Sequence, residues 1–116
     1  MRMKFAVAGL IAGPSLALAQ DDVMASRFGN TIVTHTESGH EVHMYYKPDH
    51  TFTGKVVDVD FGLKGTWAVS AGTVCLTYNP PPPTVTNPVC QPVVSHGVGD
   101  TWTVGKNTVT LVKGIQ

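Results

Sequence analysis

The sequence predicts an all-β fold: a single small antiparallel β-barrel or β-sandwich of seven to eight strands, with a short N-terminal helix and one disulfide. Short runs rich in β-branched and aromatic residues alternate between apolar and polar positions, which is the period of a half-buried strand. Turn residues separate these runs at close intervals. Together these patterns favour one sheet-based domain.

The first nineteen residues have the three parts of a removable secretory signal. Arg2 and Lys4 supply positive charge, residues 5–18 form an apolar run, and a small-x-small site ends at Ala19. We expect cleavage there, which leaves a mature domain at residues 20–116 in the periplasm or secreted. The apolar run is short of the roughly 20 residues needed to span a bilayer, so we expect no membrane span after signal removal.

The composition of the predicted mature domain argues against nucleic-acid binding. Without the signal, six basic residues stand against eight acidic ones, a net charge of −2. A nucleic-acid-binding domain normally carries a basic face. The domain is also small enough that its hydrophobic core alone would be marginal.

Cys75 and Cys90 are the two cysteines of the chain. In an oxidising compartment such a pair predicts one disulfide, with two free thiols as the alternative. The spacing is not the Cys-x-x-Cys of redox-active pairs. Closing a loop of this length stabilises a fold by about 3 kcal/mol in the chain-entropy model. Because Cys75 alternates with Val74 and Leu76, we expect the bridge on the face opposite those apolar side chains.

The elements follow in order from the mature N-terminus. Residues 21–29 begin with acidic side chains and end in glycine, which predicts a helix of about two turns. Strands are predicted at 31–36 and 40–47, on either side of a tight turn at 37–39. A third strand is predicted over 51–61.

The second half continues the strand-and-turn pattern. The runs 65–70 and 73–78 alternate cleanly and predict a hairpin. Residues 89–95 predict a returning strand at an edge, and 101–104 with 108–113 predict a last hairpin.

A run of four prolines lies between the cysteines. Proline donates no backbone hydrogen bond, so this run cannot be a central strand and should be an extended polyproline II segment. Held inside a disulfide loop, it would serve as a stiff spacer or as a rigid loop presented to a partner. The residues of this predicted partner-binding loop are Pro80, Pro81, Pro82 and Pro83.

Four short motifs resemble a family of small exported bacterial proteins catalogued as a domain of unknown function. They lie at 29–31, 45–51, 65–69 and 72–78, followed by Cys90. The resemblance implies a compact β-meander with one disulfide, exported to the periplasm, and it implies no activity. Where similar proteins often have Asp-Gly-Thr at a turn, this chain has His50 in the glycine's place. Histidine adopts the left-handed conformation less readily than glycine, so we expect a changed turn or a local specialisation.

Histidines gather between positions 35 and 50, and imidazole is a common ligand of zinc and copper. In a hairpin turning near residue 38, Glu41 and His43 share a face and His35 joins them from the facing strand. These three residues are the predicted metal ligands, with His40 and His50 as alternates. The other interpretation is a scatter of surface histidines.

The aromatic side chains allow a small-ligand site. Trp67, Trp102, Tyr45, Tyr46 and Tyr78 would line a barrel mouth, unless they simply fill the core. No catalytic residue is predicted, since no serine stands in a Gly-x-Ser-x-Gly elbow.

We therefore expect a calycin-like β-domain that acts by binding either a periplasmic or extracellular protein or a small ligand. An inhibitor-type module is one example of the first kind. The first alternative is a zinc- or copper-binding protein that uses the histidines. The second is a small enzyme with its site in the barrel mouth.

Overall fold

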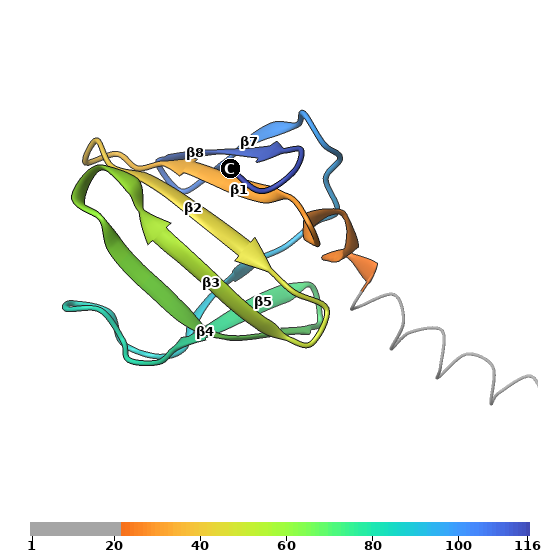
Figure 1. The fold of residues 1–116 in the computed structure, drawn as a ribbon. Helices are drawn as coiled ribbons and strands as arrows, with labels where there is room; N and C mark the ends of the chain where they lie inside the picture. Colours follow the sequence, from red (N-terminus) through yellow and green to blue (C-terminus); the bar gives the residue numbers. More distant parts are fainter. Residues whose placement is uncertain (1–21) are drawn as a thin grey trace, which may run out of the picture.

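The computed structural model describes residues 22–116, so the predicted signal peptide at 1–19 lies outside the described residues. The chain forms one antiparallel sheet of eight strands, curled into a half-barrel (Figure 1). This confirms the all-β prediction. The strands are β1 (Thr31–His35), β2 (Glu41–Tyr46), β3 (Thr51–Val56), β4 (Phe61–Ser70), β5 (Thr73–Tyr78), β6 (Val89–Pro92), β7 (Thr101–Val104) and β8 (Asn107–Val112).

The order of the strands in the sheet is β6-β5-β4-β3-β2-β1-β8-β7. Six consecutive strands form a meander, and β8 returns to pair with β1. The edge strands β6 and β7 are not paired with each other, so the half-barrel stays open between them. The predicted strand at 89–95 ends at Pro92, because the chain from residue 93 must cross this open side to reach β7 (Figure 1).

The predicted N-terminal helix is wrong. Only a 3-10 turn, η1 (Ala25–Arg27), forms there, and no side chain caps it. A helix of two turns is marginal by itself, and here tertiary burial decides the conformation. The segment that contains η1 lies at one end of the half-barrel (Figure 1). Met24 and Arg27 of this segment are buried. In the part of the chain that the structure describes, no helix has the length and apolarity to cross a membrane.

The predicted strand at 51–61 is too long, because β3 ends at Val56, the 3-10 turn η2 (Val57–Val59) follows, and β4 begins at Phe61. Asp60 takes a left-handed conformation with φ 52°, and the chain reverses into β4. The Asp58 carboxylate accepts a hydrogen bond from the Glu41 amide, which ties this turn to β2. Val57 and Val59 alternate with Asp58 and Asp60 in the sequence, but all four side chains are exposed at this turn.

Alternation along the strands places the core on the concave side. The buried side chains there include Ile32, Met44, Phe52, Leu76 and Leu111. One glycine lets the sheet close tightly around them. A Cβ at Gly65 would lie 2.0 Å from the carbonyl oxygen of Thr77 and 2.9 Å from the Phe52 ring, so only glycine fits there.

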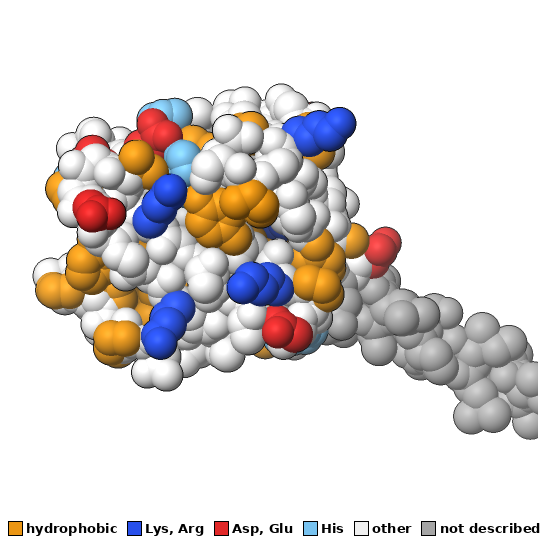
Figure 2. Space-filling model, viewed as in Figure 1, with side chains coloured by type: hydrophobic (Ala, Val, Ile, Leu, Met, Phe, Trp, Pro, Cys, Tyr) orange, Lys and Arg blue, Asp and Glu red, His pale blue; other side chains and the backbone are white. Residues whose placement is uncertain are grey.

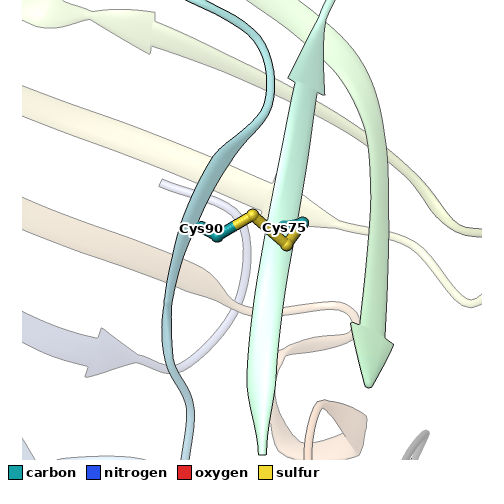
Figure 3. Close-up of a disulfide and its surroundings, with 2 residues drawn as sticks. All are labelled: Cys75 and Cys90. Carbon is teal, nitrogen blue, oxygen red and sulfur yellow. A yellow bond between two sulfur atoms is a disulfide. The ribbon is translucent and has the colours of Figure 1, made fainter. Parts of the chain in front are cut away.

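The disulfide is confirmed. Cys75 and Cys90 face each other directly across β5 and β6, with their Cα atoms 4.0 Å apart (Figure 3). Cys90 is exposed, whereas the neighbours Val74 and Leu76 are buried. The bridge therefore lies on the convex face, as the alternation predicts.

The proline loop connects β5 to β6 and takes no part in the sheet. The Asn79 amide donates to the Lys64 carbonyl oxygen, and the Asn87 side chain exchanges two hydrogen bonds with the backbone of Tyr78. The disulfide closes the same loop. The loop is thus fixed at both ends.

The turn at Asp49-His50-Thr51 packs its histidine against the core. His50 does adopt the left-handed conformation, with φ 70°. Its ring stacks on Trp67 with the centroids 4.1 Å apart, and the Trp67 Nε1–H donates to the Lys47 carbonyl oxygen. The histidine side chain thereby covers a buried tryptophan, which glycine could not do.

Candidate functional site

The concave side of the half-barrel encloses a hollow of about 410 Å³. Its walls come from β1, β2, β5, β6, β7 and β8 and from the segment that joins β6 to β7, and the inward positions of these strands carry mainly apolar side chains. This volume lies within the range of pockets that hold small molecules. The apolar wall includes Ile32, Val42, Met44, Leu76 and Val109.

A buried arginine lies at the wall of this hollow. The Arg27 side chain comes from η1 and is only 6% exposed. Its Nη1 donates to the Val23 carbonyl oxygen at 2.9 Å, and its Nη2 donates to the Val94 carbonyl oxygen at 3.3 Å. The guanidinium carbon lies 5.7 Å from the centre of the Trp102 ring. These contacts hold the group in one position.

Arg27 has no acidic partner within residues 22–116. Burial lowers the pKa of the guanidinium, but arginine starts so high that it stays charged. The described hydrogen bonds use two of its five N–H groups. The hollow therefore contains a buried positive charge with donor capacity to spare.

Two tyrosines and a histidine are among the other polar residues of the hollow, which also include Thr34, Thr36, Gln91, Thr103 and Asn107. Burial raises the pKa of Tyr46 and of Tyr78, so both hydroxyls are neutral and able to donate. His96 stacks on Trp102 with the ring centroids 3.5 Å apart. Burial, and after it the charge of Arg27, lowers the pKa of His96, so this imidazole is neutral at pH 7.

The structure brings together the three predicted metal ligands. On the convex face, a carboxylate oxygen of Glu41 lies 2.6 Å from Nε2 of His43, and the other lies 3.3 Å from Nε2 of His35. Figure 2 shows histidine and acidic side chains side by side on this face. The hydrogen bond from His43 is the main reason why the pKa of Glu41 lies below its usual value. The carboxylate is thus already bonded to both imidazoles.

The alternate ligands lie elsewhere. His40 pairs with Asp58 at 2.7 Å, between the β1–β2 and β3–β4 turns, and His50 stacks on Trp67. Among residues 22–116, no group of three or more histidine, cysteine or acidic side chains has an arrangement that could hold a metal ion.

The predicted aromatic lining divides into two groups. Tyr46, Tyr78 and Trp102 do line the hollow. Trp67 is buried beside it, and Tyr45 points from the convex face and donates to the Gln116 carbonyl oxygen. Strand alternation separates the adjacent Tyr45 and Tyr46 in this way.

Sequence reasoning missed Arg27. One signal was present, because Arg27 is the single arginine after residue 19. Its burial depends on Val94, which lies 67 positions along the chain. No local pattern reveals such a contact.

The proline loop forms a second, separate recess of about 470 Å³ on the molecule. Pro80–Pro83 lie there against the β3–β4 hairpin, where Phe61 and Leu63 contribute apolar surface. Phe61 is 44% exposed. The predicted partner loop is therefore stiff and accompanied by an exposed aromatic ring.

No protein-family model matches the chain, and neither does any curated protein or solved structure. The resemblance to exported proteins of unknown function stays a prediction. The geometry of the hollow is therefore what supports a function.

Proposed function

We propose that this domain acts by binding, and that its ligand is a small, mainly apolar molecule held in the hollow of the half-barrel. The observation that carries the proposal is the apolar hollow of about 410 Å³ with a few fixed polar groups in its wall. Ligand sites commonly combine these two features. Export to the periplasm or the exterior, as the sequence predicts, would place the ligand outside the cytoplasm.

The expected affinity for a ligand is low if apolar contact is the only interaction. Burying about 200 Å² of apolar ligand surface yields roughly 5 kcal/mol at about 25 cal/mol per Å². The loss of translational and rotational freedom offsets several kcal/mol of this gain. A purely apolar ligand should therefore bind weakly, and polar groups in the wall must add affinity.

Fluorescence titration with N-phenyl-1-naphthylamine, a neutral apolar probe, tests the proposal. Val109 and Thr108 are neighbours in β8 that point to opposite faces, so they provide a matched pair. Val109→Phe fills the hollow and should weaken probe binding by about tenfold, as expected for a few lost apolar contacts. Thr108→Phe adds the same ring on the convex side and should leave the affinity unchanged. Equal affinities in all three proteins would place the probe elsewhere and overturn the proposal.

A second candidate is binding of a periplasmic or extracellular protein through the proline loop. The exposed Phe61 ring beside Pro80–Pro83, and the fixation of the loop at both ends, favour it. Replacing the four prolines with Gly/Ser should remove a specific partner from pull-down experiments at little cost in stability. An unchanged partner list would remove this loop from consideration.

The zinc or copper alternative has less support, because Glu41 already bonds both His35 and His43. Calorimetric titration of the domain with each metal tests it. Binding tighter than ~10 µM would revive the alternative, since a weaker site would not compete for scarce metal.

A further inference from the structure

We propose that the ligand of the hollow is an amphipathic anion: a small apolar acid whose carboxylate binds Arg27. This inference rests on the proposed function and adds the chemical class of the ligand.

The first argument is the uncompensated charge. A buried cation is costly unless an anion or several hydrogen bonds compensate it. Several ionisable side chains of the described chain lie beside opposite ones, as His43 and His35 do beside Glu41 and His40 does beside Asp58. Arg27 has two carbonyl oxygens and the Trp102 ring instead. A negative charge in the hollow would complete its environment.

The second argument is the composition of the wall. The residues that line the hollow include Arg27 but neither aspartate nor glutamate. An incoming carboxylate would therefore meet one positive charge and no negative one. At low dielectric such an attraction is strong, because water does not screen it.

The third argument is geometry. The guanidinium is held between Val23 of the N-terminal segment and Val94 of the crossing segment, so it is oriented before any ligand arrives. Arginine binds a carboxylate through two parallel N–H groups, and a fixed fork loses little entropy in doing so. The neutral hydroxyl of Tyr46 lies in the same wall and offers a further donor.

Arg27 also joins two segments of the chain, and a purely structural role would explain the same hydrogen bonds. The two roles differ in what they predict for ligands. A structural arginine would not distinguish a charged ligand from a neutral one with the same apolar body.

Two fluorescent probes make this distinction in the wild-type protein. 8-Anilinonaphthalene-1-sulfonate has the ring system of N-phenyl-1-naphthylamine with a sulfonate added, and the sulfonate stands in for the carboxylate. We expect the anionic probe to bind about tenfold to a hundredfold more tightly, the range for hydrogen bonds to a charged group. Apolar partition alone would favour the neutral probe, so a preference for the anion identifies the cation.

Two variants test whether Arg27 causes the preference for the anionic probe. Arg27→Gln should abolish it while neutral-probe binding persists, and Arg27→Lys should retain part of it. In addition, octanoate should displace the bound probe at lower concentration than 1-octanol, which has the same chain length without the charge. If Arg27→Gln does not fold, the wild-type probe ratio and the octanoate–octanol comparison decide.

The outcomes separate the two levels of the proposal. If the neutral probe binds in the hollow and the anion binds no better, the anion inference fails and the binding function stands. If neither probe binds, the proposed function fails as well. If the preference survives in a folded Arg27→Gln variant, the anion is recognised elsewhere and the assignment to Arg27 is overturned.

Discussion

The two faces of the half-barrel differ in whether their ionisable side chains have partners that can carry the opposite charge. On the convex face, Glu41 bonds His35 and His43 within the same sheet. On the concave face, Arg27 is almost fully buried and meets no carboxylate among the described residues. Glu41 thus has two imidazole partners within the sheet, whereas Arg27 has no carboxylate partner among residues 22–116.

This difference suggests that a cluster of ligand-type residues is a weaker indication of a site than one buried charge that has no counter-ion among the described residues. The three convex residues lie together as the hairpin register predicts, and the Glu41 carboxylate already contacts both imidazoles, although His43 Nδ1 is buried without a hydrogen-bond partner among the described residues. Arg27 stands alone in the sequence but retains donors in an enclosed apolar space. The number of ligand-type residues in the sequence does not distinguish the convex cluster from Arg27, whereas their contacts in the structure do.

Removing the convex disulfide should give the largest effect on stability and none on ligand affinity. Replacing Cys75 and Cys90 with serine opens a loop with a sequence separation of 15 residues and should cost about 3 kcal/mol in the free energy of unfolding. Denaturant unfolding measures this loss, and probe titration measures the affinity. A large loss of affinity in the folded variant would show that the two faces are not independent.

Gly65→Ala should disturb the concave side instead. The added methyl group would collide with the Thr77 carbonyl oxygen and the Phe52 ring, so we expect a loss of about 2 kcal/mol. Because β4 and β5 would have to move apart, probe affinity should fall too. Gly62→Ala, whose added Cβ would meet nothing within 4 Å, is the matched control. Equal unfolding midpoints for both variants would contradict this account of the curvature.

The smallest effect is expected at Glu41, and it should depend on pH. Its pKa is lowered in the folded state, so its contribution to stability is present above its ordinary value near 4.5 and is lost as the pH falls through the lower folded value. Wild type and Glu41→Gln should therefore differ slightly in thermal midpoint at pH 6 and converge at strongly acidic pH. Glu37→Gln, on the neighbouring turn, is the control. A difference that grows on acidification would reverse the assigned sign.

Local sequence patterns predicted well which face of the sheet a side chain lies on, but they predicted poorly where the chain turns. Alternation placed Cys75 opposite Val74 and brought His35 next to Glu41, because both follow from a period of two. The same alternation continued across Val57–Val59, where the chain turns, since a 3-10 turn can carry the same residues. The position of Arg27 depends on a segment far along the chain, so sequence patterns could not predict the hollow's key cation.

The most direct test of the central claim is a titration of the ¹⁵N-labelled domain with octanoate, followed by two-dimensional NMR. The claim predicts that the largest shift changes occur at concave residues such as Leu76 and Val109 and at the Arg27 side-chain N–H. Residues on the convex face, such as His35 and Cys90, should change little. Shift changes confined to the convex face or to Pro-loop neighbours such as Phe61, or no changes at all, would contradict the claim that the hollow is the ligand site.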